Sequence, residues 1–289
     1  MSKNSEQTVL FPAPRLANSH DHTQGTVKNA VWTKNKSRLV QLYLEYFCYI
    51  TKHGTYIDGF AGPQYEGAEE MWCAKRVLEY GPKLLQHFYL FDNKAEQIAL
   101  LNELARKHRK HRQRDVRVTQ GDFNLTLIEF LRTRPMKDSE ATFCLLDQRA
   151  FQCDWATVET LAQYKKTGSK IELFYFLPVG WLGRSMAGKK KDKDAEMLKW
   201  WGRDDWSVLI GKSQYEHAKL FTQRFYELGY KHVDPWPIFA RNAGGRLMYF
   251  MIHASDHDDA PIQMHRAYEN TVRKLTPEAV QYSMLDSTE

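Results

Sequence analysis

The segment 56–65, YIDGFAGPQY, has the residue types of a ligand-binding turn. An apolar strand ends on the acid Asp58, and Gly59 and Gly62 follow within four residues. Small residues let backbone amides approach a ligand closely at the carboxyl edge of a parallel sheet, where α/β proteins bind ligands. A carboxylate there suits a cationic or amino-bearing ligand. The two glycines do not fit the G-x-G-x-x-G spacing of a dinucleotide site, which disfavours a nicotinamide-dependent oxidoreductase.

Acids also stand at the ends of the next two predicted strands. Asp92 follows the strand 87–91, where a carboxylate can accept both hydroxyls of a ribose. Asp122 follows the strand 116–119 and can accept the amino group of a base, while Phe123 covers the ring. Each acid could instead be a helix N-cap. Three acids at consecutive strand ends predict one crevice for an amino acid, a sugar and a base.

Two segments near the first strand resemble known methyltransferase motifs. DGFAGP resembles the first motif of class I methyltransferases, usually written D-x-F-x-G-x-G, although Gln64 replaces its last glycine. The resemblance implies that Asp58, Phe60 and Gly62 bind S-adenosylmethionine (SAM); the alternative is a purely structural turn. WTKNKSRLV (32–40) resembles the W-x-x-x-K-x-x-L segment of DNA adenine methyltransferases, in which a lysine reaches the SAM carboxylate. Lys36 holds that position and is either this ligand or a solvated lysine.

The fourth predicted strand ends in LLDQRAF, which departs from the pattern of amino-methylating enzymes. Those enzymes have [DN]-P-P-[YFW] here, and this chain keeps Asp147 but has Gln148 and Arg149 instead of the prolines. The departure puts methylation of an exocyclic amine in doubt. We expect Asp147 and Gln148 to orient the substrate or accept a proton. The alternative is that Asp147 pairs with Arg149 or caps the next helix.

Two basic runs are candidate contacts for phosphate. The run 106–114 ends the second helix of the alternating region and should lie at the amino edge of the sheet, so a solvated helix end is the favoured reading. The second run follows the fifth strand, on a predicted long loop at the opposite edge, where loops carry substrate recognition, and a plain solvated loop is an equal alternative. Its candidate substrate-binding residues are Arg184, Lys189, Lys190 and Lys191.

Three tryptophans and two histidines have simpler readings than stacking or metal binding. Trp200, Trp201 and Trp206 lie around a short helix, and we expect them in the core rather than on nucleic-acid bases. His253 and His257 have i, i+4 spacing but straddle a strand end, so buried hydrogen bonding is favoured over a metal site. No metal is predicted.

The elements that carry these residues alternate between strand and helix. A helix over 32–49 precedes five strands, and helices are expected near 69–80, 94–109, 123–133 and 154–166. A helix over 213–228 and two strands, 231–239 and 246–254, joined by the loop 241–245, end the pattern. This order predicts a doubly wound α/β fold: a mostly parallel, seven-stranded, Rossmann-like sheet with a C-terminal antiparallel hairpin, typical of class I methyltransferases.

The composition fits one globular domain. The chain has 289 residues, a net charge of +6 and four scattered cysteines without a C-x-x-C pair, which fits a reducing cytoplasm. No apolar run has the length of a membrane span, so no membrane partner is expected. We expect a polar tail over 1–25, a SAM-binding domain over 26–270 and a C-terminal tail over 271–289. The positive charge mildly favours a polyanionic partner.

Four segments together resemble the three-Cys-motif partner (TcmP) family. They are YIDGFAGP, LLDQRAFQCDW, WWGRDDW (200–206) and MYFMIHASDHDDAP (248–261), and the similarity runs from about residue 32 to 268. The resemblance implies a SAM-dependent methyltransferase fold and a possible Gp37/Gp68-type partner protein with three clustered cysteines. The leading hypothesis is therefore a methyltransferase acting on RNA or DNA with a partner protein; the alternative is a non-catalytic SAM-fold subunit of a larger complex.

Overall fold

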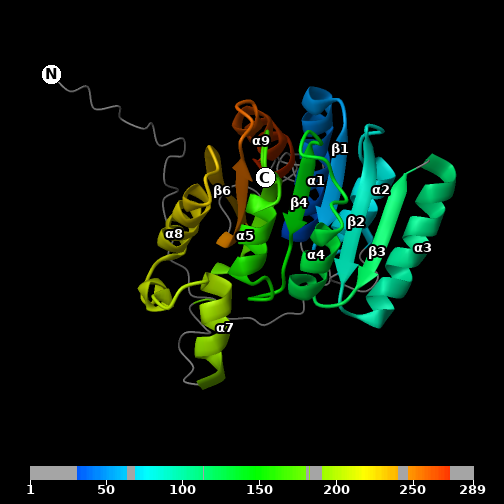
Figure 1. The fold of residues 1–289 in the computed structure, drawn as a ribbon. Coiled ribbons are helices and arrows are strands. Elements are labelled where there is room, and N and C mark those ends of the chain that lie inside the picture. Colours follow the sequence, from blue (N-terminus) through cyan, green and yellow to red (C-terminus); the bar gives the residue numbers. More distant parts are fainter. Residues whose placement is uncertain are drawn as a thin grey trace, which may run out of the picture.

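A seven-stranded sheet with helices on both faces forms the centre of the molecule in a computed structural model of the chain (Figure 1). The described residues are 31–63, 69–112, 114–179, 182, 191–239 and 247–273. The strands are β1 (Gly54–Asp58), β2 (Leu85–Asp92), β3 (Asp115–Gln120), β4 (Thr142–Leu146), β5 (Glu172–Leu177), β6 (His232–Phe239) and β7 (Leu247–Ser255).

The strand order is β3-β2-β1-β4-β5-β7-β6. Neighbours among β1 to β5 pair in parallel, whereas β7 is antiparallel to both β5 and β6. The predicted doubly wound sheet with an antiparallel C-terminal pair is confirmed, and this order is that of the class I methyltransferase fold. Pro235 and Pro237 are tolerated in β6 because it is an edge strand.

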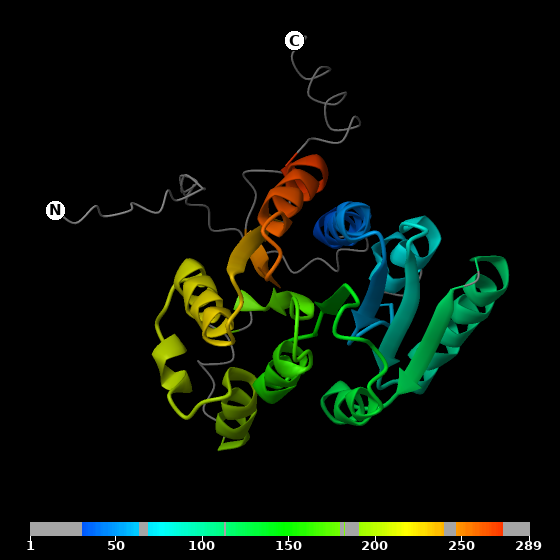
Figure 2. The ribbon, with the colours of Figure 1, turned by 45° about the horizontal axis from the view of Figure 1, so that its top comes forward.

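The helices divide between the two faces, as Figure 2 shows for α1 and α9 on one side and α5, α7 and α8 on the other. One face carries α1 (Val31–Thr51), α2 (Cys73–Tyr80), α3 (Ala95–Arg112) and α9 (Ala260–Tyr268). The other carries α4 (Phe123–Arg132), α5 (Trp155–Gln163), α7 (Lys191–Trp201) and α8 (Gln214–Glu227). Short turns are η1 (Glu69–Met71), η2 (Trp206–Leu209) and η3 (Glu269–Arg273), the last a π-helix.

The central strands are buried on both sides, which explains their continuous apolar sequences. In β4, Phe143 and Leu145 pack toward α1 and α2, while Cys144 and Leu146 pack toward α5. This alternation follows the two-residue period of a strand. It also fixes which side of the sheet each residue at a strand end will face.

Most predicted elements agree with the structure to within two or three residues at each end, but two regions differ. The basic stretch after β5 is not a loop throughout, because α7 begins at Lys191. Helix α9, which begins at Ala260 shortly after β7 ends at Ser255, was not expected. Pro261 in its first turn suits a helix start. The helical chain continues to Arg273, three residues past the predicted domain boundary.

Candidate functional site

A cavity of about 490 Å³ lies at the carboxyl edge of the parallel strands, where β1, β2 and β3 end. Its volume falls within the range of roughly 300–1,000 Å³ that small-ligand sites have. Five of the predicted cofactor-binding residues line it: Phe60, Gly62, Asp92, Asp122 and Phe123. The turn after the first strand and the next two strand ends therefore do meet at one site.

Gly62 lies where the turn after β1 passes closest to β2. Its amide donates a hydrogen bond to Oδ2 of Asp92 at 2.9 Å, and the Ala61 amide donates to the carbonyl of Phe91 at 2.8 Å. A Cβ atom at position 62 would stand 2.5 Å from Asp92 Oδ2 and 2.8 Å from Cβ of Gln97. Glycine is required here because any side chain would push into the carboxylate that faces the cavity.

The Asp92 carboxylate is half-buried at the end of β2. Its Oδ2 accepts from the Gly62 amide, and its Oδ1 accepts from the Lys94 amide at 3.1 Å. Each carboxylate oxygen has two lone pairs, so both oxygens can accept one further donor. Two fixed acceptors side by side suit a pair of neighbouring hydroxyl groups.

Asp122 and Phe123 connect β3 to α4. Oδ1 of Asp122 accepts from the Asn124 amide at 2.8 Å, so Asp122 is the N-cap of α4 and also lines the cavity. The buried ring of Phe123 packs against Phe91 and Phe60, with centroid distances of 5.2 and 5.6 Å. The two roles considered for Asp122 are compatible, and Phe123 gives the cavity an apolar wall beside an acceptor.

Three cations at the cavity were missed by the sequence reasoning: Lys94, Arg149 and Lys199. Arg149 donates from Nη2 to the carbonyl of Pro63 at 3.1 Å, which joins the loop after β4 to the turn after β1. Lys94 and Arg149 follow strand ends by two or three residues, a spacing that could have indicated them. Nothing in the sequence indicates that α7 brings Lys199 to this cavity.

Asp58 lies beneath the turn and does not line the cavity. Its side chain is buried, Oδ2 accepts from the Tyr56 hydroxyl at 2.8 Å, and Oδ1 accepts from the Phe60 amide at 3.1 Å. Tyr56 and Asp58 are two residues apart and so face the same side of the sheet, the side that α1 covers. The expected convergence of three carboxylates on one crevice therefore holds for Asp92 and Asp122 but not for Asp58.

Lys36 of α1 and Asp147 after β4 form a buried ion pair. Nζ of Lys36 is 2.5 Å from Oδ2 of Asp147, and the two residues are 2% and 6% exposed. Burial alone would lower the pKa of Lys36, but Asp147, with smaller contributions from Tyr249 and Cys73, raises it above its ordinary value. Lys36 is buried instead of solvated, and one of the three N–H donors of its ammonium is directed at Asp147. The contact expected between Lys36 and the SAM carboxylate stays a prediction.

The same cluster changes the acidity of Asp58. Burial raises the pKa of Asp58 to about 7; the hydrogen bond from Tyr56 opposes this, and the negative charge of Asp147 adds to it. Asp58 can thus exchange a proton near neutral pH although it is covered by the fold. The contact expected between Asp58 and the cofactor stays a prediction.

Two aromatic rings lie beside the Lys36–Asp147 pair. The rings of Phe176 and Tyr249 have centroids 4.6 Å apart, and Nζ of Lys36 is 6.0 and 5.9 Å from them. A cation at this distance from a ring face is attracted to it. The end of β4, helix α1 and strands β5 and β7 therefore contribute a carboxylate, a cation and two rings to one cluster.

Gln148 is buried with both ends of its amide in use. Nε2 donates to the carbonyl of Phe176 at 3.1 Å, and Oε1 accepts from the Cys153 amide at 2.8 Å. These bonds hold the loop after β4 against β5. The part expected for Gln148 in catalysis stays a prediction.

The predicted substrate-binding residues Arg184, Lys189 and Lys190 lie outside the described residues, as does Gln64. Lys191 is the first residue of α7, and its side chain is not described. The other basic run has structural partners: Arg109 donates to the carbonyl of Val116, and the buried Arg114 donates to three carbonyls in the last turn of α2 and just after it, including that of Gly81 at 3.1 Å. These bonds favour the structural reading of the run at the end of α3.

The tryptophans and histidines also have structural partners. Trp200 and Trp201 are buried in the core, as predicted, and Trp206 packs against the same cluster. His253 is buried and hydrogen-bonded to Glu172. Within the described residues, no group of three or more His, Cys, Asp or Glu side chains is arranged to hold a metal ion.

None of the helices in the described part of the chain is both long and apolar enough to cross a bilayer.

Comparisons with known proteins give only distant similarities. No family model matches the sequence, and none of the curated proteins does. Among solved structures, M. jannaschii TYW2 in complex with AdoMet is 11% identical, with 78% of this chain and 76% of that chain covered and a TM-score of 0.41. Protein LPL1258 from Legionella pneumophila is 9% identical, with 85% and 94% covered and a TM-score of 0.47.

A third similar structure, protein PH0793 from Pyrococcus horikoshii, is 12% identical, with 78% of this chain covered and a TM-score of 0.39. This chain covers 63% of that chain, less than two thirds of its length. These likenesses concern the fold alone and carry no argument about activity. The assignment to the class I methyltransferase fold rests on the strand order of the sheet.

Proposed function

We propose that this protein is a SAM-dependent methyltransferase. The observation that carries the proposal is the single cavity in which the glycine turn after β1, Asp92 after β2 and Asp122 after β3 meet. This is the edge of an α/β sheet at which ligands bind. The cradle at Gly62, which a Cβ atom would fill, and the open acceptor sites of Asp92 fit a nucleoside with a free ribose.

In this proposal each side of the cavity contacts a different part of SAM. Asp92 accepts hydrogen bonds from the two ribose hydroxyls, and Asp122 accepts a hydrogen bond from an amino group of the base. The rings of Phe60 and Phe123 cover the apolar side of the ligand. The backbone of the turn at Gly59 and Gly62 borders the sugar. SAM, when bound, supplies an activated methyl group, so the protein has mainly to position the acceptor and exclude water.

We propose that Asp147 contacts the substrate group that receives the methyl. Its Oδ2 is paired with Nζ of Lys36, and a carboxylate can hold a nucleophile or accept its proton. The rings of Phe176 and Tyr249 lie beside its partner Lys36. Lys36 positions Asp147 in this scheme.

The acceptor that we propose is nucleic acid, RNA or DNA, with a Gp37/Gp68-type partner protein. The net charge of +6 and the cations Lys94, Arg149 and Lys199 around the cavity support a phosphate-bearing substrate. The resemblance to the TcmP family supports the partner. Arg184 and Lys189 to Lys191 remain the proposed substrate contacts.

Binding and transfer are tested separately. Isothermal titration calorimetry with SAM should show one site, and Asp92→Asn should weaken it by about tenfold or more because one oxygen acceptor becomes a donor. Transfer of tritiated methyl from SAM should then be measured on total RNA and total DNA. Absence of SAM binding to the wild-type chain would overturn the proposal.

A non-catalytic SAM-fold subunit is the second candidate. The observation in its favour is that the Lys36 ammonium already occupies the Asp147 carboxylate and that Gln148 has no free amide end among the described residues. Normal SAM affinity without methyl transfer to RNA, DNA or the partner protein would favour this candidate. Transfer that Asp147→Asn abolishes at unchanged SAM affinity would exclude it.

A further inference from the structure

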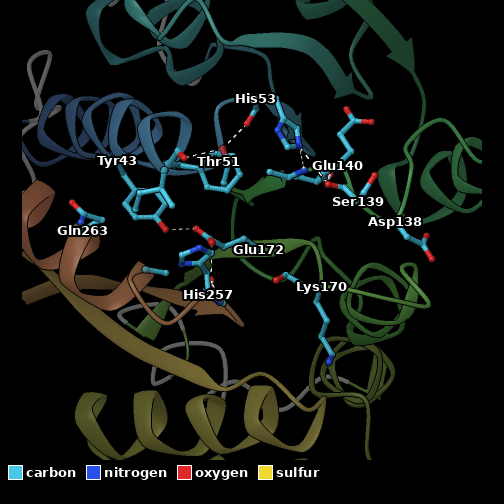
Figure 3. A pocket seen from close by; sticks show the side chains of 18 residues that line it. Tyr43, Thr51, His53, Asp138, Ser139, Glu140, Lys170, Glu172, His257 and Gln263 are labelled. Atoms are coloured by element: carbon cyan, nitrogen blue, oxygen red, sulfur yellow. Dashed lines mark hydrogen bonds between the residues drawn. The ribbon is translucent and has the colours of Figure 1, made fainter.

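A second cavity, of about 270 Å³, lies at the opposite edge of the sheet (Figure 3). Its walls come from the last turns of α1, the starts of β4 and β5, the end of β7 and the start of α9. The parallel strands begin here and end at the cavity lined by Asp92. The two cavities are therefore separated by the length of the strands.

Glu172, the first residue of β5, forms the floor of this cavity and is 5% exposed. Its Oε1 accepts from the hydroxyl of Tyr43 and from Nε2 of His253 at 2.8 Å. Its Oε2 accepts from the hydroxyl of Ser255 at 2.7 Å. Among the described residues Oε2 has this one donor, so it retains an acceptor position for a ligand.

Glu172 is a buried carboxylate. Burial raises its pKa, but the charge and hydrogen bond of His253 and the hydrogen bonds from Tyr43 and Ser255 lower it below its ordinary value overall. Among the described residues, His253 is the only basic side chain paired with this carboxylate, and it contacts Oε1 rather than Oε2. A buried carboxylate is costly unless a cation faces it.

Two lysines near this cavity have acceptors of their own. Nζ of Lys170 is 3.5 Å from Oδ2 of Asp256, and Lys165 donates from Nζ to the carbonyl of Glu140. In Figure 3 the Lys170 side chain points away from the Glu172 carboxylate. Neither of these contacts brings an ammonium onto Oε2 of Glu172.

The walls above the floor are largely apolar. Tyr43, Phe47 and Ile50 line the α1 side, and Ala260 lines the α9 side. Ring faces attract cations, and the buried carboxylate repels anions. A suitable ligand therefore has a positive end that donates hydrogen bonds and a short apolar stem.

We propose that this second cavity binds a short alkylammonium, with its ammonium on Oε2 of Glu172 and its stem along Phe47, Ile50 and Ala260. The inference does not depend on the proposed methyl transfer. In this proposal the network of Glu172, His253 and Ser255 binds a ligand and also joins β5 to β7.

The test uses the full chain with 13C-methyl-labelled alanine and isoleucine, so that Ala260 and Ile50 report on the cavity by NMR. Titration with n-butylammonium should shift both methyl signals and saturate, whereas 1-butanol and butyrate should bind at least about tenfold more weakly. A capped lysine is titrated in parallel. If the capped lysine binds more tightly, the natural ligand is the lysine side chain of a polypeptide. If butylammonium binds more tightly, the natural ligand is a free amine.

Glu172→Gln should weaken butylammonium binding about tenfold or more, and Glu140→Gln, which removes one charge at the rim, should not. Phe47→Leu is a second variant that leaves the floor intact and should weaken binding severalfold, which covers a failure of Glu172→Gln to fold. Equal binding of butanol and butylammonium would overturn the proposal. So would unchanged affinity in a folded Glu172→Gln protein, or in Phe47→Leu if Glu172→Gln does not fold.

Discussion

Lys36 and Asp147 form an ion pair that is almost completely removed from water. Such a pair adds little net stability, but the loss of one member leaves a buried charge without a partner. The Lys36 ammonium also lies 6.0 and 5.9 Å from the ring centroids of Phe176 and Tyr249. At the scale of single residues, the site therefore combines an exposed set of ligand acceptors with a covered set of charges.

Replacing only Lys36 should destabilise the protein strongly. Lys36→Met keeps the length of the stem but leaves the Asp147 carboxylate buried without a cation, so we expect a loss of about 3–5 kcal/mol in the free energy of unfolding. The double variant Lys36→Met/Asp147→Asn removes both charges and should recover most of this loss. Urea unfolding at neutral pH measures both, and equal stability of the single and double variants would contradict the argument.

Asp58 should make the stability of the protein depend on pH. Its pKa is about 7 in the folded protein against an ordinary 3.8, so between these values the folded state binds more protons than the unfolded chain. The contribution of Asp58 to the free energy of unfolding should therefore decrease as pH rises from about 4 to about 7, and level off above that. Urea unfolding across this range should show a shallower decrease for Asp58→Asn. An unchanged slope would mean that Asp58 does not titrate there.

Helices α5, α7 and α8 meet around a buried arginine, which holds one face of the sheet together. The guanidinium carbon of Arg224 is 4.5 Å from the ring centroid of Trp155 and 5.0 Å from that of Trp201. Arg224 is 3% exposed, so its stem and planar group fill space between two indoles. This packing fixes α7, the helix that brings Lys199 to the ligand cavity.

Arg224→Ala should cost about 2 kcal/mol or more in the free energy of unfolding, because it removes stacking on two rings and leaves a cavity between them. Arg203→Ala is the matched control: Arg203 pairs with Glu227 at 2.6 Å, but its side chain is 47% exposed. An exposed pair contributes roughly 0–1 kcal/mol. Similar losses in the two variants would show that the contact between Arg224 and the indoles adds no stability.

The elements were largely predictable from the sequence, and the side of the sheet that each site residue faces was not. Continuous apolar segments such as TFCLL at 142–146 identify buried strands from their composition alone. By contrast, the pairing of Lys36 with Asp147 joins residues 111 positions apart, and no local pattern encodes it. Asp58 was placed in the cavity because it ends a strand, but its side chain shares the buried face of Tyr56.

At the scale of the whole molecule, one sheet separates two hydrophobic clusters and carries a cavity at each edge. Helix α1 connects the two edges, because Lys36 contacts Asp147 at one and Tyr43 contacts Glu172 at the other. Since both clusters pack on the same strands, neither face can lose its contacts without exposing the sheet. We therefore expect the described part of the chain to unfold as one cooperative unit.

Because the sheet is expected to unfold as one unit, a ligand that binds at one edge should raise the free energy of unfolding of the whole described domain. A ligand that binds only the folded state raises the free energy of unfolding by about 2.7 kcal/mol at about a hundred times its Kd. SAM at that concentration should raise the unfolding midpoint of the wild-type protein, and the near-UV and far-UV circular dichroism transitions should move together. Asp92→Asn should lose most of this increase. Its ligand-free midpoint should fall slightly, because one of the two backbone amides that donate to Asp92 loses its acceptor. If SAM moved only one of the two transitions, the faces would unfold separately and the cofactor edge would not be coupled to the whole sheet.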